Sequence, residues 1–231
     1  GCISLEQNHD KSVKVEELDD FIVDFILNNI DVHQKLIVIG GGHNNAYPII
    51  KAKSLQHNNS LEVVNLDPHA DFRILEQRHS GNPFSFAYNN GYLSKYHALG
   101  LHKPYNSAEM IGRLKLADGV SFTFFEDYLD GKRDWGFDFV ATKDNLELNY
   151  NPVGIELDLD AIVNMPSSAL TPSGVSLDVA RTFIRTFADV NGLAYLHLPE
   201  GAPNNAQEES IVGKTLAYLV YDFISTNTIH L

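Results

Sequence analysis

The chain has 231 residues, of which 44% are hydrophobic, a length and composition that predict one folded domain rather than a disordered chain. Its formal net charge of -13 argues against general binding to nucleic acid or to anionic membranes, because neutralising phosphate groups requires Lys and Arg. The single cysteine, Cys2, excludes an intramolecular disulfide and fits a cytoplasmic protein, and no apolar run approaches the roughly 20 residues that span a bilayer.

Short apolar runs alternate with longer helix-like stretches along the chain. In chain order, the predicted elements are a helix near Val15–Asn28, a strand at Lys35–Gly40, a helix at Tyr47–Leu55, strands at Leu61–Leu66 and Tyr96–Leu101, a helix at Ser107–Leu116, strands at Gly119–Phe124 and Val153–Leu157, a helix at Leu177–Val190, a strand at Leu193–Leu198 and a helix at Glu208–Ile224. Near-continuous apolar runs such as LEVVNL suit strands that are buried on both faces. We therefore predict an α/β fold of three layers, α/β/α, with a mainly parallel sheet in the middle.

Histidine and carboxylate residues follow four of the predicted strands. In open parallel sheets, active sites lie beyond the carboxyl ends of the strands, so these residues are expected to meet at one edge. The candidates are His43 after the first strand, Asp67, His69 and Asp71 after the second, Asp158 and Asp160 around the end of VGIEL, and Glu200 after LAYLHL.

The spacing of these residues favours a metal site. Asp67, His69 and Asp71 are two residues apart, as are Asp158 and Asp160, and alternate residues of an extended chain project to the same side. Carboxylates crowded together repel one another unless cations hold them, and mixed carboxylate and imidazole ligands suit Mn²⁺, with Zn²⁺, Fe²⁺ or Co²⁺ as alternatives. Six ligands exceed the need of one tetrahedral zinc, so we predict two ions, about 3.5–4 Å apart, that activate water for hydrolysis.

Each piece also has a simpler explanation when it is taken alone. A histidine after a glycine run is more often a loop residue than a ligand, and Asp at the end of a strand often caps the next helix. The alternating Asp-x-His-x-Asp motif together with a later Asp-x-Asp at another strand end is what favours the metal site.

At these residues the sequence resembles the ureohydrolase superfamily, which includes arginases, agmatinases and formimidoylglutamases. The resemblance extends from about Lys35 to Ile224, and it implies one arginase-like metallohydrolase domain over residues 1–231 that is expected to lack N-terminal elements of the family. The matching pieces occur in the order that the family has: Gly41-Gly42-His43, Asp67-Pro68-His69-Ala70-Asp71, Gly81-Asn82-Pro83-Phe84-Ser85 and Asp158-Leu159-Asp160.

The resemblance implies a ligand set and a reaction. The reaction is hydrolysis of a C–N bond in a formimidoyl or guanidino compound. Asp71 would steer the nucleophilic water and relay its proton to the leaving amine, while Glu200 would pair with the cationic head of the substrate. The implied ligands are His43, Asp67, Asp71 and Asp158 for one manganese ion, and Asp67, His69, Asp158 and Asp160 for the other.

Several details resemble formimidoylglutamases more than arginases. Gly42 stands where arginases usually have Asp, and the loop Met165–Gly174 is similar to a formimidoylglutamase loop. Ser80 falls where arginases have a proton-shuttle histidine, which makes the adjacent His79 a candidate catalytic residue. The implied reaction converts N-formimidoyl-L-glutamate and water to L-glutamate and formamide.

Substrate recognition is less well marked in the sequence. Ser80 and Asn82 are candidate substrate-binding residues, and Arg73 is the candidate for the carboxylates of the substrate, with a solvated or structural arginine as the alternative. The sequence also departs from the family pattern. Pro68 replaces the usual Ala, and Glu156 stands where a small polar residue is common.

Other functions stay open at this point. An agmatinase or guanidino-acid hydrolase would release urea, and a metal-binding family member without catalysis would act as a structural or regulatory subunit. A nucleotide site after Gly40-Gly41-Gly42 lacks the G-x-G-x-x-G pattern, and cysteine catalysis would need Cys2, far in sequence from every motif. The expected partner is a small amidine or guanidino substrate, and the superfamily's trimers and hexamers make a homo-oligomer an expectation.

Overall fold

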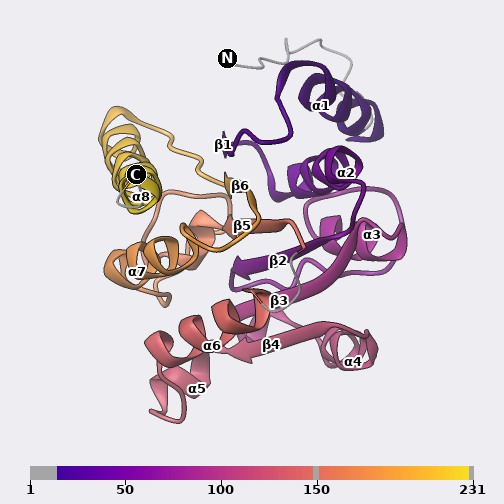
Figure 1. Ribbon diagram of the computed structural model, residues 1–231. Coiled ribbons are helices and arrows are strands. Elements are labelled where there is room, and N and C mark those ends of the chain that lie inside the picture. The colour runs from indigo at the N-terminus through magenta and orange to yellow at the C-terminus, as the bar shows by residue number, and fades with distance from the viewer. Residues whose placement is uncertain (1–14, 148–150, 229–231) are drawn as a thin grey trace.

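The computed structural model describes residues 15–147 and 151–228, so Cys2 lies outside the described residues. A single six-stranded sheet runs through the middle of the molecule, and all of its strand pairs are parallel (Figure 1). Its order is β1-β6-β5-β2-β3-β4, where the strands are β1 Leu36–Ile39, β2 Leu61–Leu66, β3 Leu93–Leu101, β4 Val120–Phe124, β5 Val153–Leu157 and β6 Leu193–Leu198.

Helices cover both faces of this sheet. One buried cluster joins one face to α1, α2, α3 and α4, and the other joins the opposite face to α6, α7 and α8 (Figure 1). This confirms the predicted α/β/α architecture. The helices are α1 Val15–Asn29, α2 Ala46–His57, α3 Pro83–Asn89, α4 Ala108–Leu116, α5 Phe125–Leu129, α6 Trp135–Glu147, α7 Leu177–Phe187 and α8 Ala206–Thr228. Among the described residues, no helix is both long and apolar enough to cross a membrane.

All six predicted strands are present, but the prediction was wrong to leave out α3, α5 and α6. Helix α3 has only seven residues and follows Gly81 and Asn82, which indicate a loop, although Pro83 suits the first turn of a helix. Helix α6 buries only Phe139 and Leu146 among its described side chains, seven residues apart, so no apolar stripe marks it in the sequence.

The strand order explains how the functional loops come together. Strands β1, β6, β5 and β2 are consecutive neighbours in the sheet, and all four point the same way. Their carboxyl ends therefore form one continuous edge, which receives the loops that carry His43, Glu200, Asp158 and Asp67.

Arg78 fastens the loop after β2 to α1 and to the residues after β1. Its guanidinium group forms an ion pair with Asp19 at 2.9 Å, and it donates to Oδ1 of Asn82 at 2.9 Å and to the carbonyl oxygen of Asn44 at 2.8 Å. The same group lies 4.6 Å from the ring centroid of Tyr47. Arg78 and Asp19 are both buried, so each charge depends on the other.

We expect Arg78→Ala to lower the free energy of unfolding by about 3–5 kcal/mol, because it leaves the Asp19 carboxylate buried without its partner. Arg113→Ala is the matched control, since Arg113 forms an exposed pair with Glu109 and its loss should change stability by less than about 1 kcal/mol. Equilibrium urea unfolding measures both changes. Equal losses in the two variants would contradict the fastening role of Arg78.

Candidate metal centre

The loop after β1 brings His43 over the edge of the sheet. Gly40 and Gly41 have φ values of 84° and 74°, a left-handed conformation that glycine adopts without strain. A side chain on Gly41 would also collide with the amide of Asn45. The turn ends in a short 3₁₀ helix, His43–Asn45, and Phe84 of α3 packs edge-on against the imidazole with ring centroids 5.2 Å apart. His43 is therefore held from two sides and is 1% exposed.

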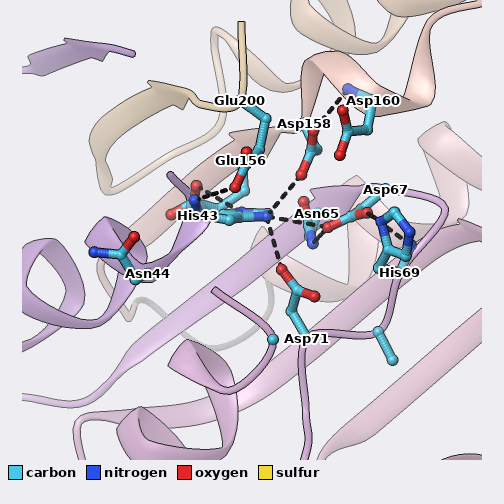
Figure 2. A network of polar contacts seen from close by, with 12 residues as sticks. His43, Asn44, Asn65, Asp67, His69, Asp71, Glu156, Asp158, Asp160 and Glu200 are labelled. Carbon is cyan, nitrogen blue, oxygen red and sulfur yellow. Dashed lines mark hydrogen bonds and ion pairs between the residues drawn. The ribbon is translucent and has the colours of Figure 1, made fainter. Parts of the chain in front are cut away.

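Three carboxylates converge on one nitrogen of His43 (Figure 2). Nδ1 lies 3.1 Å from Oδ2 of Asp67, 3.0 Å from Oδ2 of Asp71 and 3.0 Å from Oδ2 of Asp158. Asp67 and Asp158 are fully buried, and Asp71 is nearly so. These four residues are the set that the sequence assigned to one metal ion, and they come from the ends of β1, β2 and β5.

These spacings fit a divalent ion. Ligands about 2.1 Å from an octahedral ion lie about 3 Å from one another, which is the separation between Nδ1 and each carboxylate oxygen. Nδ1 is buried and has no hydrogen-bond partner of good geometry among the described residues. Once it has lost its proton, this nitrogen forms with the three carboxylates a donor set for Mn²⁺ or a similar ion.

The two remaining sequence-predicted ligands lie beside this group but outside it. Nδ1 of His69 is 3.4 Å from Oδ1 of Asp67, and the imidazole stacks on Tyr105 with ring centroids 5.2 Å apart. The Asp160 carboxylate accepts a hydrogen bond from the backbone N–H of Ala169 at 3.0 Å. The backbone N–H of Asp160 donates to Oδ1 of Asp158. Figure 2 shows His69 on the far side of Asp67 from His43.

The charges in the group shift one another strongly. Burial and the charge of Asp67 raise the pKa of Asp158 well above its ordinary value and the pKa of Asp71 to about 6. Burial alone would lower the pKa of His43, but the three carboxylates raise it well above its ordinary value. Burial would raise the pKa of Asp67, but the imidazoles of His43 and His69 hold it below its ordinary range. The group thus retains protons that a cation would displace.

Glu200 approaches the group from the end of β6. Its Oε1 accepts a hydrogen bond from the backbone N–H of His43 at 2.6 Å, and its own N–H donates to the carbonyl oxygen of Gly41 at 2.9 Å. Glu200 and Asp71 both have positive φ, at 70° and 46°, which is unusual for residues other than glycine. Such strain is characteristic of functional positions that the surrounding structure holds in place.

The loop after β2 places the other candidate residues differently. Asn82 is fully buried, and its side chain bonds Arg78, the His79 N–H and the carbonyl oxygen of Gln77. His79 lies with Nε2 3.1 Å from Glu76 and accepts the Gly81 N–H on Nδ1. Ser80 is exposed. The structure therefore brings none of these three into the group around His43.

Arg73 borders a cavity of about 310 Å³ beside the metal centre. His69 and Asp71 form one side of this cavity, and Arg113 of α4 lies on its wall together with Tyr105. No local pattern in the sequence marks Arg113 or Tyr105, because the segments that carry them meet the site only in three dimensions. Glu76 and Glu109 also line the cavity, and Glu109 lies 3.1 Å from the guanidinium of Arg113. Arginines beside a metal centre suit a ligand with carboxylate groups.

A second set of buried polar residues lies beneath His43, and the sequence analysis did not assign it a role. Oε2 of Glu156 is 3.4 Å from Nε2 of His43 and 2.7 Å from Nδ1 of His197, and Tyr195 donates its hydroxyl to Oε1 at 2.7 Å. Burial raises the pKa of Glu156, but His197 and His43 outweigh it and lower the pKa to about 2. Polar residues in the otherwise apolar strands VGIEL and LAYLHL were the available signal.

Comparisons with known proteins agree with this geometry. Formimidoylglutamase from Streptococcus pyogenes serotype M3 is 29% identical over 121 residues, which make up 49% of this chain and 37% of that protein. The match therefore spans just over a third of the length of this relative.

Solved structures share the fold. The formimidoylglutamase from Bacillus subtilis has a TM-score of 0.78 at 17% sequence identity and covers 93% of this chain and 68% of its own. The Trypanosoma cruzi formiminoglutamase with Mn²⁺ has a TM-score of 0.78 at 17% identity and covers 94% of this chain and 73% of its own. The model of the arginase family matches residues 5–225, nearly the whole sequence, and the chain therefore belongs to the arginase family.

Proposed function

We propose that the protein is a binuclear metal-dependent hydrolase that cleaves a C–N bond of a formimidoyl or guanidino compound. The substrate we favour is N-formimidoyl-L-glutamate, which would give L-glutamate and formamide. The observation that carries the proposal is the convergence of Asp67, Asp71 and Asp158 on Nδ1 of His43, beside a cavity that Arg73 lines.

The ligands divide into two sets that share Asp67 and Asp158. His43 and Asp71 complete the first set, which the structure already gathers. His69 and Asp160 complete the second set. When bound, the ions would act as Lewis acids and lower the pKa of a water molecule. Manganese is the ion we favour, because carboxylates dominate the donor set and the Trypanosoma cruzi relative was solved with Mn²⁺.

Asp71 and Glu200 supply the proton transfer and the substrate orientation in this proposal. Asp71 would take the proton from the attacking water and pass it to the departing nitrogen, so that the C–N bond breaks with a neutral amine leaving. The Glu200 carboxylate would pair with the cationic amidine head of the substrate. The backbone N–H of His43 holds this carboxylate in position by donating to its Oε1 at 2.6 Å. A positioned carboxylate loses little entropy when it binds the substrate.

The cavity beside the site favours a substrate that carries carboxylates. Arg73 and Arg113 on its wall would attract a glutamate-like tail and would repel the amine tail of agmatine. The same arginines would accept a guanidino acid, so a guanidino-acid hydrolase that releases urea is the second candidate. We assign Asn82 to the packing of its loop rather than to substrate binding, because its polar atoms are used within that loop.

We also propose that the protein forms a homo-oligomer and acts in the cytoplasm. Helix α8 buries Val212, Leu219 and Phe223 against the core, as the sequence favoured. It also exposes Tyr218 and Tyr221, which supports a contact between copies of the chain.

The manganese-loaded protein should release formamide from N-formimidoyl-L-glutamate, and Asp158→Ala should lose most of the activity, because it removes a carboxylate shared by both ligand sets. The exposed Asp144→Ala is the matched control and should keep full activity. Product analysis distinguishes formamide from urea. Urea from a guanidino acid would retain the mechanism and change the substrate, whereas no turnover with two metals bound would favour a family member without catalysis.

Arg73→Ala should raise KM for a carboxylate-bearing substrate about 10–100-fold with a smaller change in kcat, because a charge-assisted hydrogen bond to the substrate tail contributes about 1.5–3 kcal/mol. Steady-state kinetics measures this split. Arg133→Ala, whose guanidinium pairs with Asp138 outside the cavity, serves as the control. An unchanged KM in Arg73→Ala would exclude Arg73 from substrate binding.

Protons should destabilise metal binding and stabilise the metal-free fold. The pKa of Asp71 rises from 3.8 to about 6 on folding, so the folded state binds the extra proton between these values and stability falls as pH rises through them. We expect the metal-free protein to lose stability from pH 4 to pH 7 relative to Asp71→Asn, which lacks this titration. Urea unfolding at several pH values measures the difference. Parallel pH profiles for the two proteins would contradict the shift of Asp71.

A further inference from the structure

A row of polar side chains crosses the sheet directly beneath the metal centre. Asn65, Glu156 and His197 are register partners on the adjacent strands β2, β5 and β6, and all three are fully buried. Strands buried on both faces usually carry apolar residues, and a buried polar side chain is unfavourable unless it is hydrogen-bonded. Three such residues at one level of the sheet therefore indicate a shared role.

Asn65 contacts a ligand of the metal centre from this row. Its Nδ2 donates to Oδ2 of Asp67 at 3.1 Å (Figure 2). The same Nδ2 donates to the hydroxyl of Tyr96 at 3.0 Å. Tyr96 in turn donates to the carbonyl oxygen of Ala70, in the loop that carries the ligands. The row thus connects the interior of the sheet to the ligands above it.

Glu156 makes the corresponding contact with His43. In strand β5, alternate residues face the same side, so Glu156 lies on the side from which Asp158 projects into the metal centre. The imidazole of His43 bridges the two levels, with Nδ1 3.0 Å from Asp158 and Nε2 3.4 Å from Glu156 (Figure 2). Each nitrogen of His43 therefore faces carboxylate oxygen at ion-pair distance, and neither contact has the geometry of a hydrogen bond.

Two neighbouring side chains hold the Glu156 carboxylate in place. Tyr195 donates to Oε1 and His197 lies at Oε2, each at 2.7 Å. Nδ1 of His197 faces Glu156, and Nε2 of His197 has no hydrogen-bond partner among the described residues. Gly154, the register partner of Tyr195, makes room for this arrangement, because a Cβ there would collide with the tyrosine ring.

The position of one proton on His43 decides whether Nδ1 can bind a metal. A neutral imidazole has one N–H, so Nδ1 has a free lone pair only when the proton is on Nε2. Carboxylates surround Nδ1 and would hold the proton there, which would block the ligand atom. Among the described residues, the carboxylate facing Nε2 is Glu156, and it favours the opposite tautomer.

We propose that Glu156, held by Tyr195 and His197, is a positioning residue that fixes His43 in the Nε2–H tautomer and directs its Nδ1 lone pair toward the metal. The inference rests on the metal centre of the proposed function, but not on the substrate or the reaction. This role gives a physical reason for a carboxylate at position 156, where the family commonly has a small polar residue. Partners of this kind typically change metal affinity about 10–100-fold.

Glu156→Gln tests the proposal by metal affinity. We expect it to weaken Mn²⁺ binding about 10–100-fold in equilibrium dialysis, since an amide stabilises the Nε2–H of His43 less than a carboxylate does. Glu62→Gln is the matched control, because Glu62 is also a fully buried glutamate of the sheet but lies at the start of β2. Its Mn²⁺ affinity should equal that of the wild type.

A spectroscopic readout separates positioning from a general loss of structure. In the protein loaded with diamagnetic Zn²⁺, ¹⁵N-histidine NMR should show His43 protonated on Nε2 in the wild type and in Glu62→Gln. Glu156→Gln should lose this protected Nε2–H signal. Tyr195→Phe keeps the ring over Gly154 and removes only one hydrogen bond to Glu156, so it should weaken Mn²⁺ binding by less than Glu156→Gln does.

The outcomes distinguish this inference from the proposed function. If Glu156→Gln binds metal with the affinity of the wild type and shows the same His43 spectrum, the positioning role is overturned and the proposed function is not affected. Should Glu156→Gln fail to fold, equal Mn²⁺ affinity in Tyr195→Phe and wild type would overturn it. A third ion bound per chain through His43, Glu156 and His197 would make Glu156 a ligand and would also overturn it. No metal binding by the wild type would overturn both proposals.

Discussion

Like charges are crowded together at the carboxyl edge of the sheet. Asp67, Asp71 and Asp158 lie around one nitrogen of His43 in a place nearly closed to water, where unscreened negative charges repel strongly. The arrangement is stable only with compensating positive charge, from protons or from a metal ion. Three parallel strands, β1, β2 and β5, deliver these side chains to one point, so the sheet order and the charge requirement determine the site together.

Backbone strain at the same edge points to the same conclusion. Asp71 and Glu200 have positive φ, a conformation that costs a residue with a Cβ about 1–2 kcal/mol and that glycine would adopt freely. Glycine at either position would relieve the strain and would remove a carboxylate from the site. Hydrogen bonds fix the strained position of Glu200, since its N–H donates to Gly41 and its side chain accepts from His43. The structure thus retains strain where a carboxylate has to point inward.

The sequence predicted all six strands because buried parallel strands are nearly continuous apolar runs. The candidate ligands came from the spacing of the residues and from the family resemblance, and the structure gathers four of the six while His69 and Asp160 lie beside them. It failed at α3 and α5, which are short, and at α6, whose buried residues form no apolar stripe. Asn82 looked like a substrate contact by motif, but its role depends on Arg78, four residues away, whose partner Asp19 lies in α1. Contacts between distant segments leave no local pattern, and Arg113 was missed for the same reason.

The departure from the family pattern at Glu156 is explained by the residues that surround it. A carboxylate alone in the middle of a sheet would be strongly unfavourable, yet here it accepts from Tyr195 and His197 and faces the Nε2 of His43. Gly154 provides the space that Tyr195 needs. In the sequence, Glu156 and His197 are marked only as polar residues in apolar strands, and together with Tyr195 they form one hydrogen-bonded unit beneath the candidate ligands. The metal centre therefore has two levels, and the lower level orients the atoms with which the upper level binds.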